Sequence, residues 1–224
     1  MSDAATLVID IGGRNVKLGL MPEARRAKFP SGRSFTPQAL VTAVAAATAG
    51  WEFARVTVGC PGPVKDGRIV VAPVNLGPGW VGFDFAAAFG RPTLLVNDAA
   101  MQAVGAYEGG KLLFLGLGTG LGAALVTESC VLGLELAHLP YRKGRTFEDY
   151  VGQRGLDRRG SQKWQASVAD VIERLKAAAV ADSVVLGGGN AKLLDPLPAG
   201  VRRGANADAL TGGERLWLGG MRVY

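Results

Sequence analysis

The segment TLVIDIGGRNVKLGL, residues 6–20, contains two apolar runs joined by a polar, glycine-rich turn. The runs cover residues 7–11 and 16–20, and the turn between them reads GGRN. Short apolar runs connected in this way predict a β-hairpin. Such a hairpin places Asp10, which stands next to the last residue of the first run, beside a glycine turn.

The second half of the chain opens with the same order of elements. A strand is expected at residues 112–117, a glycine-rich turn at 116–122 and another strand at 123–126. The likeness between the halves lies in this order rather than in residue identity. It predicts two related lobes, and Gly109-Gly110 marks the expected boundary between them.

Strands and helices alternate through the rest of the sequence. Thr36 followed by Pro37 is a start signal for a helix, and Asp84 is a second expected N-cap. The helices are expected at 38–47, 84–90, 99–107, 164–175 and 206–217, and further strands at 55–59, 93–96 and 184–186. Another helix is expected to start directly after the glycine turn at 187–189. This order predicts an α/β fold with two lobes and a central cleft. The first lobe is expected to hold residues 1–108 and about 205–224, and the second residues 109–204.

Composition narrows the class of protein. The chain has 224 residues, of which 48% are hydrophobic, which is enough for one sizeable core or two small lobes. Its net charge of +6 comes from scattered basic residues, so an ordinary solvated surface is favoured over a polyanion site, and neither nucleic acid nor membrane is expected as a partner. Two cysteines and a single histidine form neither a disulfide framework nor a zinc site. No signal peptide or apolar run of membrane-spanning length is visible, so a cytoplasmic location is expected.

Three glycine turns carry polar groups suited to phosphate. They read DIGGRN at 10–15, GLGTGLG at 116–122 and GGGN at 187–190. Glycine lets the backbone approach an anion, and exposed N–H groups donate to phosphate oxygens. One such turn alone is weak evidence. All three in this order, with Asn97-Asp98 at a strand end between the first two, indicate a phosphate-binding cleft.

Eight motifs distributed over nearly the whole chain carry a family resemblance. They are DIGG at 10–13, GCPGPV at 59–64, NLGPGW at 75–80, ND at 97–98, LGTG at 117–120, ELAH at 135–138, FEDY at 147–150 and VLGGG at 185–189. With them the chain resembles the sugar kinase, heat-shock ATPase and actin superfamily, and within it the ROK sugar kinases of the polyphosphate glucokinase-like branch. The resemblance implies a two-lobed ribonuclease H-like fold. It also implies phosphoryl transfer from polyphosphate or ATP to the 6-hydroxyl of a hexose, with glucose the expected sugar.

The resemblance also implies roles for individual residues. Asp98 becomes the base for the sugar hydroxyl, although a strand-end Asp taken alone is more often a helix N-cap. The implied sugar-binding residues are Gly62, Asn75, Asn97, Glu135, His138 and Glu148. The implied donor-binding residues are Asp10, Gly12, Gly13, Arg14, Asn15, Lys17, Gly118, Thr119, Gly120, Gly188 and Gly189. Asp10 is expected to hold Mg²⁺ through water, and Mg²⁺ bridges phosphate oxygens. The family members are expected to form homodimers.

The sequence departs from the family pattern at three places. The stretch 139–145 lacks the cysteines of the family's zinc site, so no zinc is expected, and Ala137 replaces a glycine. Arg14 replaces the small hydroxyl residue of the first phosphate loop. A guanidinium suits phosphate oxygens but is bulkier than Thr, which leads to the hypothesis that polyphosphate is preferred over ATP. The alternative is that Arg14 points to solvent from the hairpin tip.

Two other functions compete with a kinase. A catalytically weak or inactive sugar-binding protein of the same fold is compatible with Arg14, while Asp10, Asp98 and Thr119 favour activity. A sugar-responsive regulator would need an N-terminal winged-helix domain, and only about five residues precede the first expected strand. Closure of the lobes around the sugar is expected about a hinge near residues 107–110.

Overall fold

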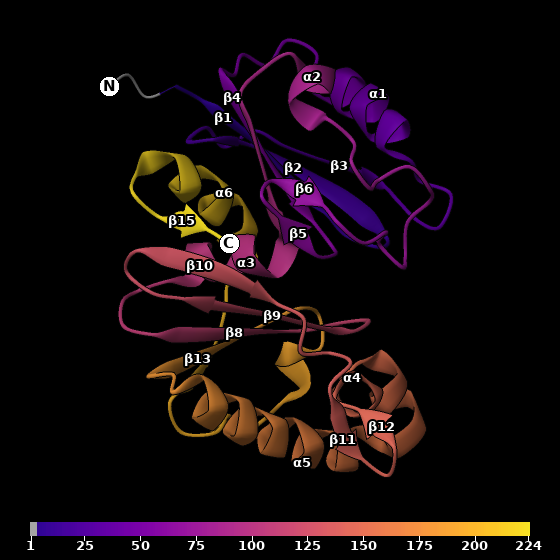
Figure 1. Ribbon diagram of the computed structural model, residues 1–224, viewed down its shortest axis with the longest axis vertical. Coiled ribbons are helices and arrows are strands. Elements are labelled where there is room, and N and C mark those ends of the chain that lie inside the picture. Colours follow the sequence, from indigo (N-terminus) through magenta and orange to yellow (C-terminus); the bar gives the residue numbers. More distant parts are fainter. Residues whose placement is uncertain (1–3) are drawn as a thin grey trace.

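Two mixed β-sheets, one from each half of the chain, form the framework of the computed structural model, which describes residues 4–224 (Figure 1). The first sheet has the strand order β3-β2-β1-β4-β7. Its strands are β1 (Thr6–Ile11), β2 (Asn15–Met21), β3 (Arg26–Pro30), β4 (Arg55–Cys60) and β7 (Thr93–Asn97). Strand β1 pairs antiparallel with β2 and parallel with β4, and β4 pairs parallel with β7. The carboxyl ends of these three parallel strands therefore lie at one edge of the sheet.

The second sheet has the order β14-β13-β8-β9-β10-β15. Its strands are β8 (Leu112–Leu117), β9 (Leu121–Val126), β10 (Cys130–Leu134), β13 (Ser183–Gly187), β14 (Val201–Arg203) and β15 (Arg222–Val223). Strands β8 and β9 form an antiparallel hairpin, and β13 runs parallel to β8. Two smaller hairpins are β5 (Val64–Lys65) with β6 (Arg68–Ile69), and β11 (Pro140–Arg142) with β12 (Arg145–Thr146).

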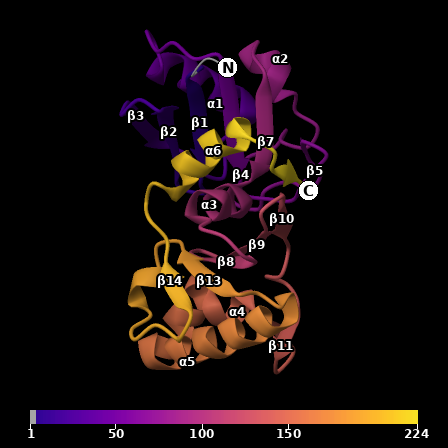
Figure 2. The ribbon, with the colours of Figure 1, turned by 90° about the vertical axis from the view of Figure 1, so that its left-hand side faces the viewer.

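The helices form layers around and between the sheets (Figures 1 and 2). Helices α1 (Pro37–Ala47) and α2 (Phe85–Phe89) cover the outer face of the first sheet, and α3 (Asp98–Ala106) and α6 (Asp208–Leu218) lie between the two sheets. The outer face of the second sheet carries α4 (Glu148–Val151), α5 (Gln153–Ala179) and the short 3₁₀ helix η1 (Ala191–Leu193). None of the helices in residues 4–224 is both long enough and apolar enough to cross a membrane.

The contact between α3 and α6 depends on glycine. A Cβ atom added to Gly212 would lie 1.8 Å from the carbonyl oxygen of Met101, and one added to Gly105 would lie 1.9 Å from that of Asp208. Only glycine permits this approach of two helix backbones. Valine and alanine side chains of α3 then pack into a core shared with both sheets. Helix α3, which begins at Asp98, is thus fixed from both sides.

Most of the expected elements are present, with local differences. The expected helix starts are confirmed by side-chain caps, since Thr36 accepts a hydrogen bond from Ala39 N and Asp84 from Ala87 N. Strand β9 begins at Leu121, two residues before the expected start. The helix expected after the third glycine turn is a single 3₁₀ turn, η1. Strands β3, β10, β14 and β15, the two small hairpins and helix α4 were not expected, and α5 begins at Gln153, well before the expected residue 164.

Candidate active site

The carboxyl ends of β1 and β7 bring the first acidic residues together. Asp10 in β1 is paired with Gly59 of β4, whose next residue, Cys60, is paired with Asn97 at the end of β7. Asp98 follows directly and opens α3. Parallel strands present their carboxyl ends at one edge of the sheet, so Asp10 and Asp98 lie at the same edge.

Asn97, and not Asp98, is the N-cap of α3. Its Oδ1 accepts hydrogen bonds from Ala99 N at 3.0 Å and Ala100 N at 3.1 Å, while its Nδ2 donates to the Gly62 carbonyl at 3.1 Å. Asp98 Oδ1 accepts from Ala99 N at 2.8 Å. Within residues 4–224 no hydrogen bond reaches Asp98 Oδ2, so this oxygen is free to accept one from a bound molecule.

The pKa of the Asp98 carboxyl is raised from its ordinary value of 3.8 to about 7. Burial is the main cause, because it disfavours the charged form, and the negative charges of Asp10 and Glu135 add to it. The hydrogen bond from Ala99 N opposes the rise. A carboxyl with a pKa near neutral pH, one oxygen of which is free, has the properties of a general base.

A cavity of about 480 Å³ extends from Asp10 toward the second sheet. Besides the first sheet, its lining comes from α3, from β8, from the segment that runs from β13 to η1, and from the segment that runs from β14 to the start of α6. The lining residues are Asp10, Lys17, Gln102, Phe114, Leu186, Gly187, Gly188, Gly189, Ala191, Lys192, Arg203, Gly204, Ala205, Asn206, Asp208 and Ala209. We call this cavity the donor cleft. It brings the predicted residues Asp10, Lys17, Gly188 and Gly189 together from both halves of the chain.

Asp10 and Lys17 form an ion pair at the mouth of the donor cleft. Lys17 Nζ lies 3.2 Å from Asp10 Oδ2, and the lysine side chain is 58% exposed while that of Asp10 is 9% exposed. On the opposite wall, Gly188 has φ +79°, and a Cβ there would lie 2.3 Å from the Leu117 carbonyl oxygen. Glycine is therefore required at this turn by both conformation and space.

The predicted second phosphate loop, Gly118 to Gly120, lies between β8 and β9 and outside the lining of the donor cleft. Its carbonyl groups accept hydrogen bonds from the start of α5 and from the third glycine turn. Gln153 N donates to the Gly118 and Thr119 carbonyls at 3.0 and 3.2 Å, and Asn190 Nδ2 donates to the Gly118 carbonyl at 3.3 Å and to Gln153 Oε1 at 3.0 Å. Asn190 thereby connects the second and third glycine turns.

Glu135, His138 and Glu148 lie close enough to influence one another. Burial raises the pKa of the Glu135 carboxyl, the neighbouring His138 lowers it, and Glu148 raises it. Glu148 Oε2 accepts a hydrogen bond from Leu121 N at 3.2 Å, so one of its oxygens supports the start of β9. Glu135 and His138 are both exposed. The negative charge of Glu135 also raises the pKa of Asp98, so Glu135 lies near Asp98.

The remaining predicted residues lie in the turn between β1 and β2. Gly12 N donates to the Asn15 carbonyl at 2.9 Å, and a Cβ on Gly13 would lie 3.0 Å from the Cβ of Asn75. The turn therefore contacts the Asn75 loop. Arg14 is exposed at the tip of the turn and does not line the donor cleft. Its part in donor choice stays a prediction.

Five polar residues of the donor cleft were absent from the residues proposed from sequence: Gln102, Lys192, Arg203, Asn206 and Asp208. Lys192 and Arg203 add two cations to the wall opposite Lys17. Arg203 is held in place because its guanidinium donates to the Leu194 carbonyl at 2.6 Å. No local pattern identifies these residues, since Gln102 lies within α3 and the other four follow the third glycine turn at irregular distances.

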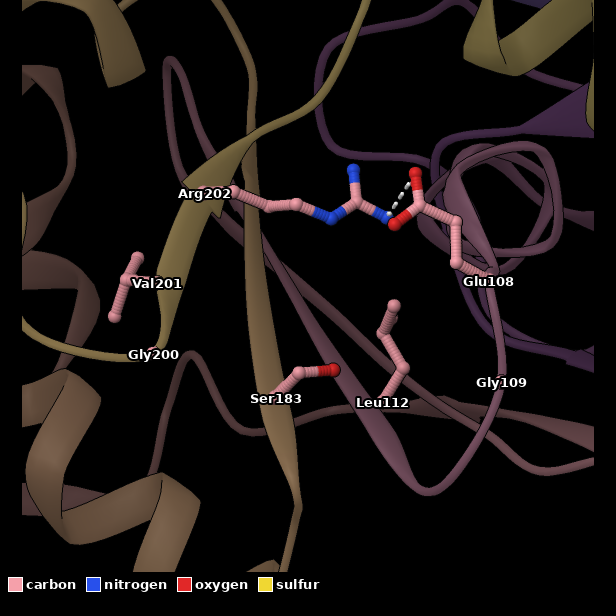
Figure 3. A pocket seen from close by; sticks show the side chains of 7 residues that line it. All are labelled: Glu108, Gly109, Leu112, Ser183, Gly200, Val201 and Arg202. Atoms are coloured by element: carbon pink, nitrogen blue, oxygen red, sulfur yellow. Dashed lines mark ion pairs between the residues drawn. The ribbon is translucent and has the colours of Figure 1, made fainter.

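A second cavity of about 390 Å³ lies at the other end of the second sheet (Figure 3). Leu112 and Ser183, the first residues of β8 and β13, line it, whereas the donor cleft contacts the last residue of β13. Arg202 reaches across it to Glu108, with Nη2 3.3 Å from Oε1. This cavity is separate from the donor cleft.

The wall of the donor cleft contains a carboxylate, that of Asp10, which suits magnesium. Within residues 4–224 no three side chains of His, Cys, Asp or Glu are grouped so as to hold a metal ion. Magnesium in phosphoryl-transfer sites is commonly held by one or two carboxylates together with water and substrate phosphates. Asp10 supplies one such carboxylate in the wall of the cleft. The site therefore fits a magnesium ion that arrives with a phosphate-containing donor.

Solved structures with the same fold include several that are named as sugar kinases. The inorganic polyphosphate/ATP-glucomannokinase from Arthrobacter sp. strain KM is 24% identical, covers 96% of this chain and 98% of its own, and has a TM-score of 0.82. The ROK family glucokinase from Streptomyces griseus, solved with glucose and AMPPNP, is 17% identical over 95% and 98%, with a TM-score of 0.75. The ROK hexokinase from Thermus thermophilus is 22% identical over 94% and 96%, with a TM-score of 0.69. No family model and no curated protein sequence matches the chain.

These likenesses confirm the expected fold class. The chain has the two-lobed α/β fold of the ROK sugar kinases, and the match extends over nearly its whole length. At identities of 15–24% the likeness defines the fold. The reaction, the sugar and the donor must be argued from the site itself.

Proposed function

We propose that this protein is a hexose kinase that transfers a phosphoryl group to the 6-hydroxyl of glucose or a closely related hexose. The observation that carries the proposal is Asp98. It is a partly buried carboxyl with a pKa of about 7 and a free oxygen, at the strand edge that it shares with Asp10 and the donor cleft. Phosphoryl transfer requires an aligned hydroxyl, a base for its proton and neutralisation of phosphate charge.

In the proposed mechanism, Asp98 Oδ2 accepts the proton of the sugar hydroxyl as the hydroxyl oxygen attacks the donor's terminal phosphorus. The bond from this phosphorus to its bridging oxygen breaks, and ADP or the polyphosphate chain shortened by one phosphate leaves with the electron pair. Asn97, the Gly62 backbone, Asn75, Glu135, His138 and Glu148 bind the remaining sugar hydroxyls. Polar partners of this kind discriminate a pyranose better than an apolar pocket does. Lys17 donates to the donor's phosphates. Asp10 would hold magnesium through water, and the ion would offset the phosphate charge.

Charge in the donor cleft favours polyphosphate as a donor. Lys17, Lys192 and Arg203 line the cleft against two carboxylates, Asp10 and Asp208. The one aromatic ring in the lining, Phe114, is only 1% exposed, so it offers little surface on which a purine base could stack. Polyphosphate has no base or ribose and benefits from cations along its whole length. The similar Arthrobacter kinase is named for both polyphosphate and ATP.

A coupled assay for hexose 6-phosphate tests the proposal directly. Glucose and mannose are each supplied with ATP or polyphosphate in the presence of magnesium. We expect turnover with glucose and a higher kcat/KM for polyphosphate than for ATP. Hexose binding without turnover on either donor would contradict the proposal and favour an inactive sugar-binding protein.

The other expectations from sequence form part of the same proposal. The lobes comprise residues 1–108 with about 205–224, and residues 109–204, and they close on the sugar. The loop Gly118, Thr119 and Gly120 binds donor phosphate after this closure, together with the backbone of Gly12, Gly13 and Asn15. The enzyme acts in the cytoplasm as a homodimer.

A further inference from the structure

A row of paired residues crosses the first sheet beginning at Asp10. In the register of the strands, Asp10 is paired with Lys17 of β2, and Lys17 is paired with Lys28 of β3. Directly paired residues on neighbouring strands point to the same face of the sheet. Val8, two residues before Asp10 and therefore on this face, packs in the core with α3. The row thus faces the interior between the sheets, on the side that holds the donor cleft.

The two lysines of this row have different surroundings. Lys17 is partly neutralised by Asp10 at 3.2 Å. Lys28 is exposed, and none of the ion pairs within residues 4–224 includes it. Like charges directly opposite one another in a sheet are destabilising. The pair Lys17–Lys28 therefore presents a cationic surface that an anion would stabilise.

We propose that Lys28 extends the donor site beyond the donor cleft, and that Lys17 and Lys28 together bind the part of a polyphosphate chain that trails from the transferred phosphate. This inference rests on the proposed function. Strands are spaced about 4.8 Å apart, so the row from Asp10 to Lys28 is about 10 Å long. A long polyanion with regularly spaced charges contacts both lysines, whereas a short phosphate held at Asp10 contacts Lys17 alone. Lys28 is thus a residue that selects for donor length.

The test compares binding of long-chain polyphosphate and pyrophosphate without hexose, by isothermal titration at several salt concentrations. The variant is Lys28→Gln, and the matched control is Lys163→Gln. Lys163 is also exposed and forms none of the ion pairs in residues 4–224, but it lies on α5 at the outer face of the second sheet.

We expect Lys28→Gln to weaken long-chain binding about two- to five-fold, the range for an exposed ion pair, and to leave pyrophosphate binding unchanged. The slope of log affinity against log salt should fall by roughly 0.7–0.9, because one phosphate contact is lost. Lys163→Gln should match the wild type on both ligands.

Three results would overturn the inference. They are an unchanged long-chain affinity in Lys28→Gln, an equal loss in Lys28→Gln and Lys163→Gln, and a wild type that does not bind long-chain polyphosphate. Because binding is measured without hexose, this test is independent of turnover. A wild type that binds polyphosphate through Lys28 but phosphorylates no hexose would contradict the proposed function and support the inference.

Discussion

Asp98→Asn is expected to lower activity and raise stability in the same molecule. The substitution removes the proposed base but keeps an oxygen that can accept the hydrogen bond from Ala99 N. Turnover should fall by a factor of about 10²–10⁴ or more, the range for loss of a general base. Affinity for the sugar should change far less, because Asp98 acts on the proton that leaves during transfer.

The gain in stability follows from the raised pKa of Asp98. Since this pKa is about 7 in the folded protein and 3.8 ordinarily, the folded state binds the proton more tightly than the unfolded state. The protonated Asp98 carboxyl therefore contributes to the free energy of unfolding. This contribution is fully present below about pH 4 and is lost as the pH rises through about 7. At about 1.36 kcal/mol for each pH unit, the total is about 4 kcal/mol, of which about 2 kcal/mol is lost between about pH 5.5 and pH 8.

Urea unfolding followed by tryptophan fluorescence, in buffer with a metal chelator, measures this effect. The free energy of unfolding of Asp98→Asn relative to the wild type should be about 2 kcal/mol more favourable at about pH 8 than at about pH 5.5. Asp66→Asn is the control, since Asp66 is exposed in the turn between β5 and β6. The same difference at both pH values, or near-normal turnover in the variant, would refute the assignment of Asp98.

Glu148→Gln should weaken hexose binding by about 1–3 kcal/mol, because sugar hydroxyls lose a charged acceptor. Isothermal titration with glucose measures this effect, and an unchanged affinity would mean that Glu148 has only a structural role. Gly212→Ala should lower the free energy of unfolding by about 1–3 kcal/mol or more, since its Cβ would meet the Met101 carbonyl oxygen at 1.8 Å. Gly118→Ala, where a Cβ meets nothing within 4 Å, is its control in thermal unfolding. Arg14→Thr should lower the ratio of polyphosphate to ATP turnover, and an unchanged ratio would exclude Arg14 as the selector.

Local signals in the sequence were sufficient for the two hairpins and for most helices. The apolar runs of β1, β2, β8 and β9 end at glycine turns, and Thr36 and Asp84 form the caps that their positions predict. Three strands that were not expected, β3, β14 and β15, are edge strands that are short or polar. Strand β3 has the sequence RAKFP, and β15 has two residues whose position depends on pairing with β10. Such edge strands are defined by their partner, so their own residues carry little signal.

Some features of the candidate site were predicted from the sequence, and others were decided only by the structure. The family resemblance selected Asp10, Asn97 and Asp98, and their position at strand ends agreed with it, because parallel strands present their carboxyl ends together. The sequence could not decide which of Asn97 and Asp98 caps α3, and the hydrogen bonds of Asn97 Oδ1 settle this in favour of Asn97.

The sequence by itself determined the α/β class, the order of its elements and the glycine turns, since each depends on residues close together in the chain. Only the tertiary structure placed Lys192 and Arg203 opposite Lys17, and only strand register placed Lys28 beside it. The pKa of Asp98 is likewise a tertiary property, because burial and the charges of Asp10 and Glu135 come from segments remote in sequence. Register, burial and the electrostatic field all depend on which distant segments pack together, and no local pattern of residues specifies that.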